Sequence, residues 1–204
     1  MSIRIRTALK KDFLAMHKMD LAANATHPFY IIPWKTAGVG ACEAFILDRY
    51  EYLYHSRNPE YTFLVATAGD EIVGYLIYRK PLGEGEPGEW NPTFPNGTNL
   101  NFFDKVFGEV KAAKKQYNLK GYWELEGFAV HPNWQRKGVG STLVNKFLES
   151  VDADHAKCCV RASRIGKSLY EKFGFKMMGV VSIDLKEFGD YEPYTTWDMQ
   201  REAV

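Results

Sequence analysis

The sequence predicts an α/β fold, a mixed α+β sheet in one domain, and three observations carry this prediction. The first half contains two adjacent segments rich in β-branched and aromatic residues, which form a hairpin. In the second half, strand-like segments alternate with helix-like ones. No linker divides the 204 residues convincingly, so we expect a single domain over residues 1–204.

The first half of the chain begins with a strand, because apolar side chains alternate with Arg4 and Arg6 in the period-2 pattern of a half-buried strand. Two segments with apolar residues at helical spacing follow, and the aromatic stretch 27–35, which contains two prolines, separates them as a loop. The hairpin turn is Gly69-Asp70. The expected elements are a strand at 3–7, helices at 11–23 and 44–56, and strands at 61–68 and 71–79.

The second half follows a long loop at 81–97 that is rich in Gly and Pro. After this loop the apolar period becomes helical, and strand and helix patterns then alternate toward the C-terminus. The expected elements are helices at 102–117, 141–151 and 164–173, and strands at 122–130, 156–162, 175–183 and 194–200.

Composition excludes several classes of protein. The 26 basic and 25 acidic residues nearly cancel, which argues against a nucleic-acid-coating protein. Three cysteines cannot build a disulfide framework, no apolar run approaches the ~20 residues of a membrane span, and the N-terminus lacks the apolar core of a signal peptide. No Cys/His spacing indicates a metal site. We therefore expect a cytoplasmic or nuclear protein that binds no nucleic acid, membrane or metal.

The most informative segment follows the predicted strand that ends at Val130. Gly138 and Gly140 open the next helix, where glycines let a ligand approach the backbone and leave N–H groups pointing outward. These donors and the helix dipole together form a site for a phosphate or pyrophosphate. The segment is not a Walker A loop, because Lys137 precedes Gly138. It is not a dinucleotide fingerprint either, because Leu143 occupies the third glycine position.

The pattern Gln135-x-x-Gly138-x-Gly140 resembles the pyrophosphate loop, Gln/Arg-x-x-Gly-x-Gly/Ala, of the GCN5-related N-acetyltransferases, the GNAT family. A Val-His-Pro turn typical of that family precedes it. Downstream, the segment 163–175 resembles the family's second signature, including its Leu-Tyr pair and its terminal Gly-Phe. The resemblance covers the C-terminal half closely and the N-terminal half by the order of its elements.

The resemblance implies the GNAT fold, with acetyl-CoA between splayed fourth and fifth strands. Residues 122–175 would be the binding core, and about 80–121 an inserted loop and helix. One departure is Ser163, because many relatives carry an asparagine there that hydrogen-bonds the pantetheine. The residues implied to bind acetyl-CoA, mostly through backbone groups, are Phe128, Ala129, Val130, Gln135, Arg136, Lys137, Gly138, Val139, Gly140, Ser141, Ser163 and Tyr170.

Acetyl transfer to an amine needs two groups that handle protons. A base takes the proton from the amine, and an acid assists the leaving thiolate. Tyr170 occupies the family's position for the acid; the alternative is a core aromatic. Glu124 and Glu126 share one face of a strand, and either is a candidate base unless both pair with Lys or Arg. Glu124 matches the catalytic glutamate of the histone-acetylating branch. We expect His131 to be structural.

The resemblance also implies that the amine acceptor enters opposite the cofactor, between the loop 27–35 and the region 188–194. Phe29, Tyr30 and Trp34 in that loop suit an amphipathic small-molecule amine through apolar and cation–π contacts. The alternative is that these aromatic side chains only close the core.

The acidic loop 81–97 is a candidate lid that would favour a cationic acceptor, although Glu84, Glu86 and Glu89 could equally be solvated. The leading prediction is an acetyl-CoA-dependent N-acetyltransferase for a small-molecule amine, as a monomer or homodimer. Family membership does not fix the acceptor. The alternatives are a protein lysine or N-terminal acetyltransferase, a non-catalytic acyl-CoA-binding module, and a nucleotide-binding protein that uses the same anion loop.

Overall fold

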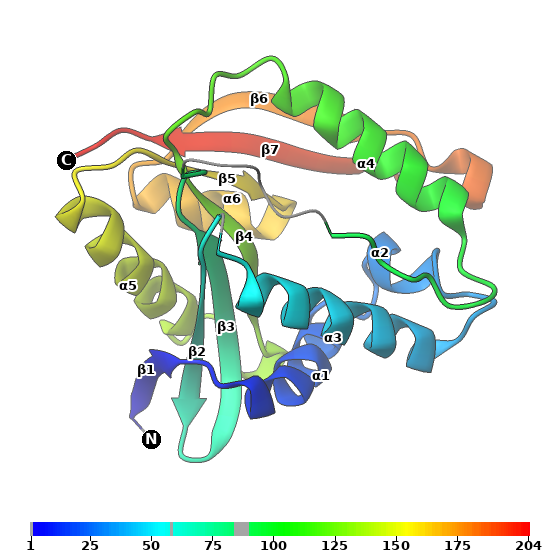
Figure 1. Ribbon diagram of the computed structural model, residues 1–204, viewed down its shortest axis with the longest axis horizontal. Coiled ribbons are helices and arrows are strands. Elements are labelled where there is room, and N and C mark those ends of the chain that lie inside the picture. Colours follow the sequence, from blue (N-terminus) through cyan, green and yellow to red (C-terminus); the bar gives the residue numbers. More distant parts are fainter. Residues whose placement is uncertain (1, 58, 84–89) are drawn as a thin grey trace.

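A seven-stranded sheet with strand order β1-β2-β3-β4-β5-β7-β6 forms the centre of the computed structural model, which describes residues 2–57, 59–83 and 90–204 (Figure 1). Strands β4 and β5 pair in parallel, and the other neighbouring pairs are antiparallel. The strands are β1 (Ile3–Thr7), β2 (Tyr61–Ala68), β3 (Glu71–Arg79), β4 (Trp123–Val130), β5 (Cys158–Ala162), β6 (Lys176–Ile183) and β7 (Tyr194–Arg201).

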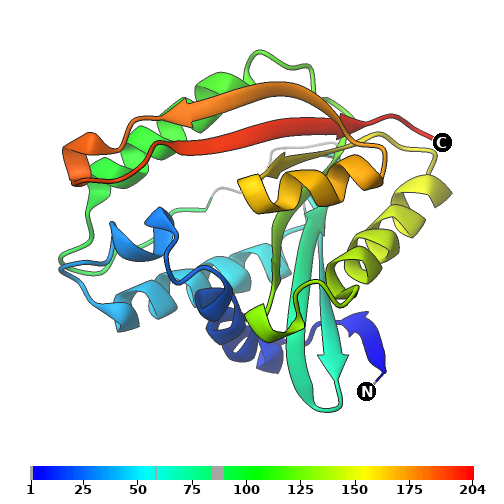
Figure 2. The ribbon, with the colours of Figure 1, turned by 180° about the vertical axis from the view of Figure 1, so that it is seen from behind.

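Helices cover both faces of this sheet, as the two opposite views show (Figures 1 and 2). They are α1 (Phe13–Ala23), α2 (Pro28–Ile31), α3 (Val39–His55), α4 (Leu100–Lys114), α5 (Val139–Ala153) and α6 (Arg164–Lys172). On one face, Phe13 of α1 and Tyr50 of α3 pack against β2 and β3. On the other face, Leu143 and Phe147 of α5 pack against β3 and β4. The sheet therefore has a hydrophobic core on each side.

Helix α4 lies along the C-terminal strands β6 and β7 (Figure 1). Phe102 and Val106 of its apolar face pack with Val181 and Ile183 of β6. These helix positions are four residues apart, as expected for one face of an amphipathic helix. Helix α4 therefore contributes to a third core cluster, on β6, beyond the two that cover the two faces of the central sheet.

Strands β4 and β5 are neighbours over only part of their length. Their parallel register ends where Leu125 faces Val160. Beyond this point β4 continues to Val130 with β3 as its partner, whereas β5 continues beside β7. The splay between the fourth and fifth strands is thereby confirmed. It leaves one backbone edge of residues 126–130 open.

A β-bulge in β4 lies at the start of this open edge. On β3, the consecutive residues Ile77 and Tyr78 face Gly127 and Leu125, so Glu126 is the additional residue on β4. A bulge bends its strand and redirects the side chains around it. The bend therefore separates β4 from β5 at the point where their pairing ends.

Most predicted elements agree with the structure, and the hairpin strands β2 and β3 agree at both ends. The prediction for α3 was wrong at its start, which lies at Val39 and not at residue 44. Gly38, with φ +85°, turns the chain into this helix, and Gly40 interrupts the apolar pattern of its first turn. The expected loop 27–35 contains the short helix α2, which begins with Pro28 at a position where proline fits a helix.

Over the ranges that the structure describes, no helix has the length and apolar character needed to cross a bilayer. The same ranges contain no group of three or more His, Cys, Asp or Glu side chains placed to hold a metal ion. Glu84, Glu86 and Glu89 of the predicted acidic lid lie outside the described residues.

Candidate active site

The open edge of β4 ends at Phe128, Ala129 and Val130. Ala129 packs on the α1 side of the sheet, whereas Phe128 and Val130 pack on the α5 side. The Gln135 side-chain amide donates a hydrogen bond of 3.1 Å to the Val130 carbonyl. Gln135 thus ties the loop after β4 back to the strand that the loop leaves.

The loop between β4 and α5 holds its shape through local contacts. His131 Nδ1 accepts a hydrogen bond of 3.2 Å from the backbone N–H of Asn133, which agrees with its expected structural role. Arg136 has φ +60° and Gly138 has φ +85°, so two left-handed residues frame Lys137 just before the helix. Only glycine adopts such a backbone without cost, and Arg136 is therefore in a strained conformation.

The first turn of α5 presents backbone donors at the end of this loop. Within residues 131–141, all of which are described, no side chain caps the helix N-terminus. Uncapped N–H groups and the helix dipole attract anions, and the neighbouring Arg136 and Lys137 side chains are exposed. The loop and first-turn residues are Gln135, Arg136, Lys137, Gly138, Val139, Gly140 and Ser141.

Gly140 lets the start of α5 approach the open edge of β4. A Cβ atom on Gly140 would lie 3.1 Å from Cζ of Phe128 and 3.4 Å from Cδ2 of Leu169. The distance to Phe128 is shorter than ordinary van der Waals contact. Glycine therefore lets the helix N-terminus and the β4 edge lie side by side without displacing the Phe128 ring.

Tyr170 of α6 lies across the splay from β4. Its ring centroid is 6.2 Å from that of Phe128 and 5.5 Å from that of Phe175. The residue is buried, and burial raises the pKa of its phenol above the ordinary value. A phenol that stays protonated is able to donate a proton, so the position and protonation state of Tyr170 suit an acid.

Ser163 caps α6, because its hydroxyl oxygen accepts a hydrogen bond of 3.2 Å from the backbone N–H of Gly166. Ser, Thr, Asp and Asn are the residues that fill this position in helices. Capping of α6 therefore explains a serine at position 163 without any contact to a ligand. A pantetheine contact from its hydroxyl remains a prediction.

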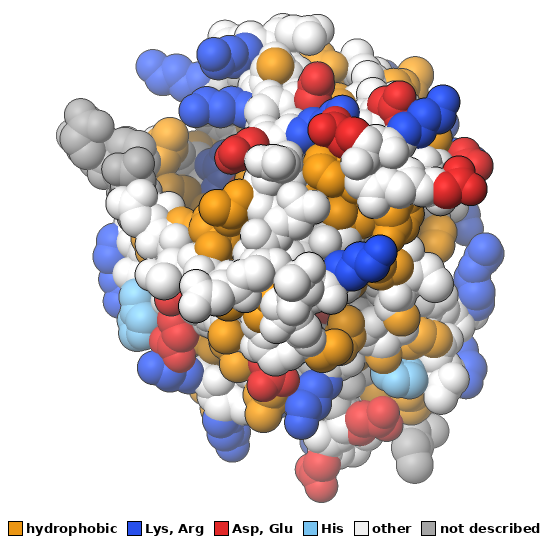
Figure 3. All heavy atoms as spheres, turned by 90° about the vertical axis from the view of Figure 1, so that its right-hand side faces the viewer, with side chains coloured by type: hydrophobic (Ala, Val, Ile, Leu, Met, Phe, Trp, Pro, Cys, Tyr) orange, Lys and Arg blue, Asp and Glu red, His pale blue; other side chains and the backbone are white. Residues whose placement is uncertain are grey.

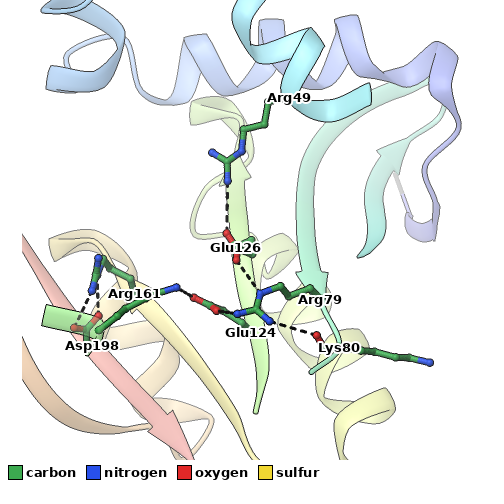
Figure 4. A network of polar contacts seen from close by, with 8 residues as sticks. Arg49, Arg79, Lys80, Glu124, Glu126, Arg161 and Asp198 are labelled. Atoms are coloured by element: carbon green, nitrogen blue, oxygen red, sulfur yellow. Dashed lines mark hydrogen bonds and ion pairs between the residues drawn. The ribbon is translucent and has the colours of Figure 1, made fainter. Parts of the chain in front are cut away.

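Glu124 and Glu126 share one face of β4, as predicted, since both bind Arg79 of β3 (Figure 4). Glu126 accepts a hydrogen bond of 3.1 Å from Arg79 Nε and lies 3.5 Å from a guanidinium nitrogen of Arg49. Glu124 is paired with Arg79 and also with Lys114, the last residue of α4. The two candidate bases thus belong to one network of alternating charges.

The network keeps Glu124 ionised. Burial alone would raise the pKa of this carboxyl, but the Lys114 ammonium and the Arg79 guanidinium lower it below the ordinary value. A base with a low proton affinity and two cationic partners is a weak acceptor for an amine proton. Both glutamates form ion pairs, which is the alternative to a catalytic role. The case against a role as base is stronger for Glu124.

A second polar pair lies on the other side of the splay, on β5 and β7 (Figure 4). Arg161 binds Asp198 through two hydrogen bonds of 2.8 and 3.0 Å. Both residues are largely buried, with side-chain exposures of 15% and 6%. The sequence does not indicate this pair, because its partners are far apart in the chain and no local motif joins them.

The two segments predicted to flank the acceptor lie together. Phe29 of α2 contacts Tyr194 at the start of β7, with ring centroids 5.5 Å apart. His27 also contacts Tyr194, at 5.3 Å. Tyr30 donates a hydrogen bond to Asp20 of α1. The aromatic side chains at this junction thus make contacts with one another and with α1.

Trp34 is a core residue, with an exposure of 5%. Its ring packs on Phe45 and Phe103, and its indole N–H donates a hydrogen bond of 2.9 Å to the Phe29 carbonyl. These contacts satisfy the side chain fully, so Trp34 offers no surface to an acceptor. For this residue the structure favours the core alternative over substrate binding.

A cavity of about 100 Å³ lies on the side of the molecule where α2, the start of α4 and the β6–β7 connection meet. Figure 3 shows this side, on which acidic and basic side chains are interspersed with apolar ones. The cavity is separate from the β4–β5 splay. Its lining residues are Ile32, Pro33, Lys35, Thr36, Gly97, Asn99, Phe188 and Tyr191.

Solved structures of acetyltransferases share this fold. One from Corynebacterium glutamicum, described as histone acetyltransferase HPA2 and related acetyltransferase, superposes with a TM-score of 0.64 at 19% identity and covers 100% of this chain and 98% of that chain. The PaiA N-acetyltransferase from Thermoplasma acidophilum, in complex with coenzyme A, has a TM-score of 0.51 at 17% identity, with 99% of each chain covered. At such identities the likeness concerns the fold alone.

Sequence comparison gives the family. The chain is 29% identical over 100 residues to an acetyltransferase from Stachybotrys chartarum, a match that spans 49% of this chain and 41% of that relative. The chain thus covers less than half the length of this relative. The model of the Acetyltransferase (GNAT) family matches residues 22–175, which is well over half of the chain. The chain therefore belongs to the GNAT family of acetyltransferases.

Proposed function

We propose that this protein transfers the acetyl group of acetyl-CoA to a primary amine by direct attack in a ternary complex. The observation that carries the proposal is the junction of an open β4 edge with an uncapped helix N-terminus at Gly138–Gly140. An extended pantetheine would pair with an open strand edge, and a pyrophosphate would suit the helix end beside it.

Each group of residues has a proposed part in binding acetyl-CoA. Backbone groups of Phe128, Ala129 and Val130 would pair with the pantetheine, and the amides of residues 136–141 would hold the pyrophosphate. The exposed Arg136 and Lys137 side chains would add positive charge near the phosphates. Of these two, Lys137 also lies 5.5 Å over the Trp134 ring, which holds the ammonium near the loop.

Tyr170 would donate a proton to the thiolate as the carbon–sulfur bond breaks. Its hydroxyl has the protonation state that this role needs, because burial keeps the pKa of the phenol high. Its ring lies beside Phe128, whose backbone would bind the pantetheine near the thioester. The amine nitrogen would attack the carbonyl carbon, and a base on the acceptor side would receive the amine proton.

A small-molecule amine is the proposed acceptor. Arg49, Arg79 and Arg161 form ion pairs on the two sides of the splay, and His27, Phe29 and Tyr194 form an aromatic junction at the start of β7. An amphipathic amine would bind such a mixture of aromatic and polar groups through both of its parts.

Two assays test the function. Acetyl-CoA should raise the thermal unfolding midpoint, whereas ATP and NAD should not. Free-thiol release should then depend on an added primary amine, with phenethylamine, spermidine and lysine as probes. Stabilisation by acetyl-CoA without amine-dependent thiol release would instead indicate a non-catalytic acyl-CoA-binding module.

The Tyr170→Phe variant tests the acid. It should lower kcat by about 10²-fold while the Kd for acetyl-CoA stays nearly unchanged, because the hydroxyl acts on the leaving group and not on binding. Tyr122→Phe is the matched control, since the Tyr122 hydroxyl donates a hydrogen bond to Gln200 near the end of β7. An unchanged kcat in Tyr170→Phe would leave Tyr170 as a core aromatic.

A further inference from the structure

Asp20 of α1 is a buried carboxylate, with 5% of its surface exposed. Among the described residues, no Lys, Arg or His forms an ion pair with it. The other buried aspartates differ, because Asp12 pairs with Arg6 and Asp198 pairs with Arg161. An unpaired buried carboxylate is costly to ionise, so its presence calls for a reason beyond packing.

Neutral hydrogen-bond donors surround the Asp20 carboxylate. The Tyr30 hydroxyl donates to Oδ2, and the Asn24 side-chain amide donates to Oδ1 at 2.8 Å. The Tyr75 side chain of β3 also stabilises the ionised carboxyl and lowers its pKa. The other titratable groups that face it are Arg49, Tyr50 and Cys42, all from α3.

Tyr75 connects this carboxylate to the open edge of β4. It stands opposite Ala129 in the β3–β4 register, and its Cε2 atom lies 3.3 Å from the place where a Cβ on Gly127 would be. Gly127 follows the bulge, at the start of the segment that would hold the pantetheine. The Tyr75 ring therefore lies between the proposed reaction centre and Asp20.

The glutamates on β4 leave the role of base open. Glu124 binds two cations, and Glu126 binds Arg79 and lies close to Arg49. Their lone pairs are engaged by these cations, which disfavours proton uptake. Asp20 has no such partner, and burial raises the pKa of its carboxyl above the ordinary value, which makes the ionised form a stronger base.

We propose that Asp20 receives the proton that the acceptor amine loses, with the Tyr75 hydroxyl as the relay. The amine nitrogen forms its bond to the acetyl carbon and gives its proton to the Tyr75 oxygen, while Tyr75 passes its own proton to Asp20. Tyr75 is unchanged at the end, Asp20 is protonated, and the carbon–sulfur bond breaks with the electron pair on sulfur. The inference rests on the proposed acetyl transfer.

The pH dependence of kcat tests this inference. With phenethylamine and with an amine of lower pKa, such as trifluoroethylamine, the acidic limb of the wild-type profile should fall at the same pH, because an enzyme group sets it. Asp20→Asn should lower kcat by about 10²-fold and abolish the limb, without a change in the Kd for acetyl-CoA.

A separate variant tests the relay through Tyr75. Tyr75→Phe should lose about as much activity as Asp20→Asn, and the double variant should lose no more than either, because the two residues act in one path. Tyr30→Phe removes a donor from the ionised carboxylate, so it should keep the acidic limb and move it to higher pH. Asp12→Asn, at a buried aspartate with an ion-pair partner, is the matched control and should keep the wild-type limb.

Folding is checked separately through the thermal midpoint at pH 7, where Asp20→Asn should equal or exceed the wild type because an unpaired buried charge is removed. If Asp20→Asn kept both the kcat and the acidic limb of the wild type, the inference would be overturned while the proposed function stands. A limb that disappears in Glu126→Gln instead would also overturn it. Wild-type protein that releases no thiol with any amine would overturn the proposed function, and this inference with it.

Discussion

His17 of α1 has both ring nitrogens buried, and within the described part of the chain neither has a hydrogen-bond partner. Burial lowers the pKa of the imidazole below 6.5, with Glu43 opposing and Lys18 adding to the shift. The folded protein therefore holds His17 neutral. Below the ordinary histidine pKa of about 6.5 the unfolded chain binds the proton first, and this part of the stability is lost as pH falls.

The free energy of unfolding should thus fall by about 1 kcal/mol more in the wild type than in His17→Leu between pH 7.5 and pH 5. Urea denaturation at the two pH values measures this difference. His155→Gln, at an exposed histidine, should follow the wild type. An equal loss in His17→Leu and in the wild type would mean that His17 is not held neutral by the fold.

Single residues also show what the sequence can and cannot predict about a site. The loop at Gln135–Gly140 is identified from the sequence because its residues are close together and their spacing is itself the signal. The partners of Glu124 come from α4 and β3, so their approach depends on how these elements pack. Asp20 gave no signal either, because its burial and its tyrosine neighbours arise only in the folded protein.

At the scale of elements, the close approach of α5 to β4 depends on Gly140. In Gly140→Ala the new methyl group would press on the Phe128 ring, and overpacking of this kind costs about 1–3 kcal/mol. The backbone of Phe128 belongs to the proposed acetyl-CoA edge. Gly140→Ala should therefore lower the unfolding free energy and weaken acetyl-CoA binding, as measured by thermal shift and by titration.

Gly108→Ala is the control for this prediction. Gly108 lies in α4, where an added Cβ meets nothing within 4 Å. Alanine in an exposed helix interior should stabilise by about 0.5–1 kcal/mol relative to glycine. If Gly140→Ala gave the same gain and the wild-type affinity, the contact between α5 and Phe128 would have no part in the site.

Elements were predictable where local patterns are complete. Strands β2 and β3 agree at both ends because alternation and the Gly69-Asp70 turn define them locally. The start of α3 was missed because Gly38 and Gly40 remove the apolar period from its first turn. The strand order β5-β7-β6 has no local signal, since it is decided by pairing between segments that are far apart.

At the scale of the whole molecule, Lys114 connects helix α4 to the central sheet through Glu124. In Lys114→Met, Glu124 keeps Arg79 but loses one of its two cations. The free energy of unfolding at pH 7 should fall by about 1–3 kcal/mol. Because the pKa of Glu124 is lowered in the folded state, this difference is present above about pH 4.3 and shrinks as pH falls further.

Urea denaturation at pH 7 and at low pH measures this effect. Lys146→Met is the matched control, because Lys146 pairs with Glu149 on the exposed face of α5. Exposed pairs contribute about 0–1 kcal/mol, so this variant should stay near the wild type at both pH values. A loss in Lys114→Met that does not change with pH would point to the packing of its methylene groups and not to its charge.

The splay between β4 and β5 gives the protein a sheet edge inside its own fold. Edges on the outside of a sheet attract other strands and lead to aggregation. Here β4 is held on its other side by β3, and β5 diverges from it only after Leu125, so the open edge lies between two strands of the same sheet. We therefore expect this edge to pair with a single extended ligand, such as the proposed pantetheine, and not with a strand of a second polypeptide.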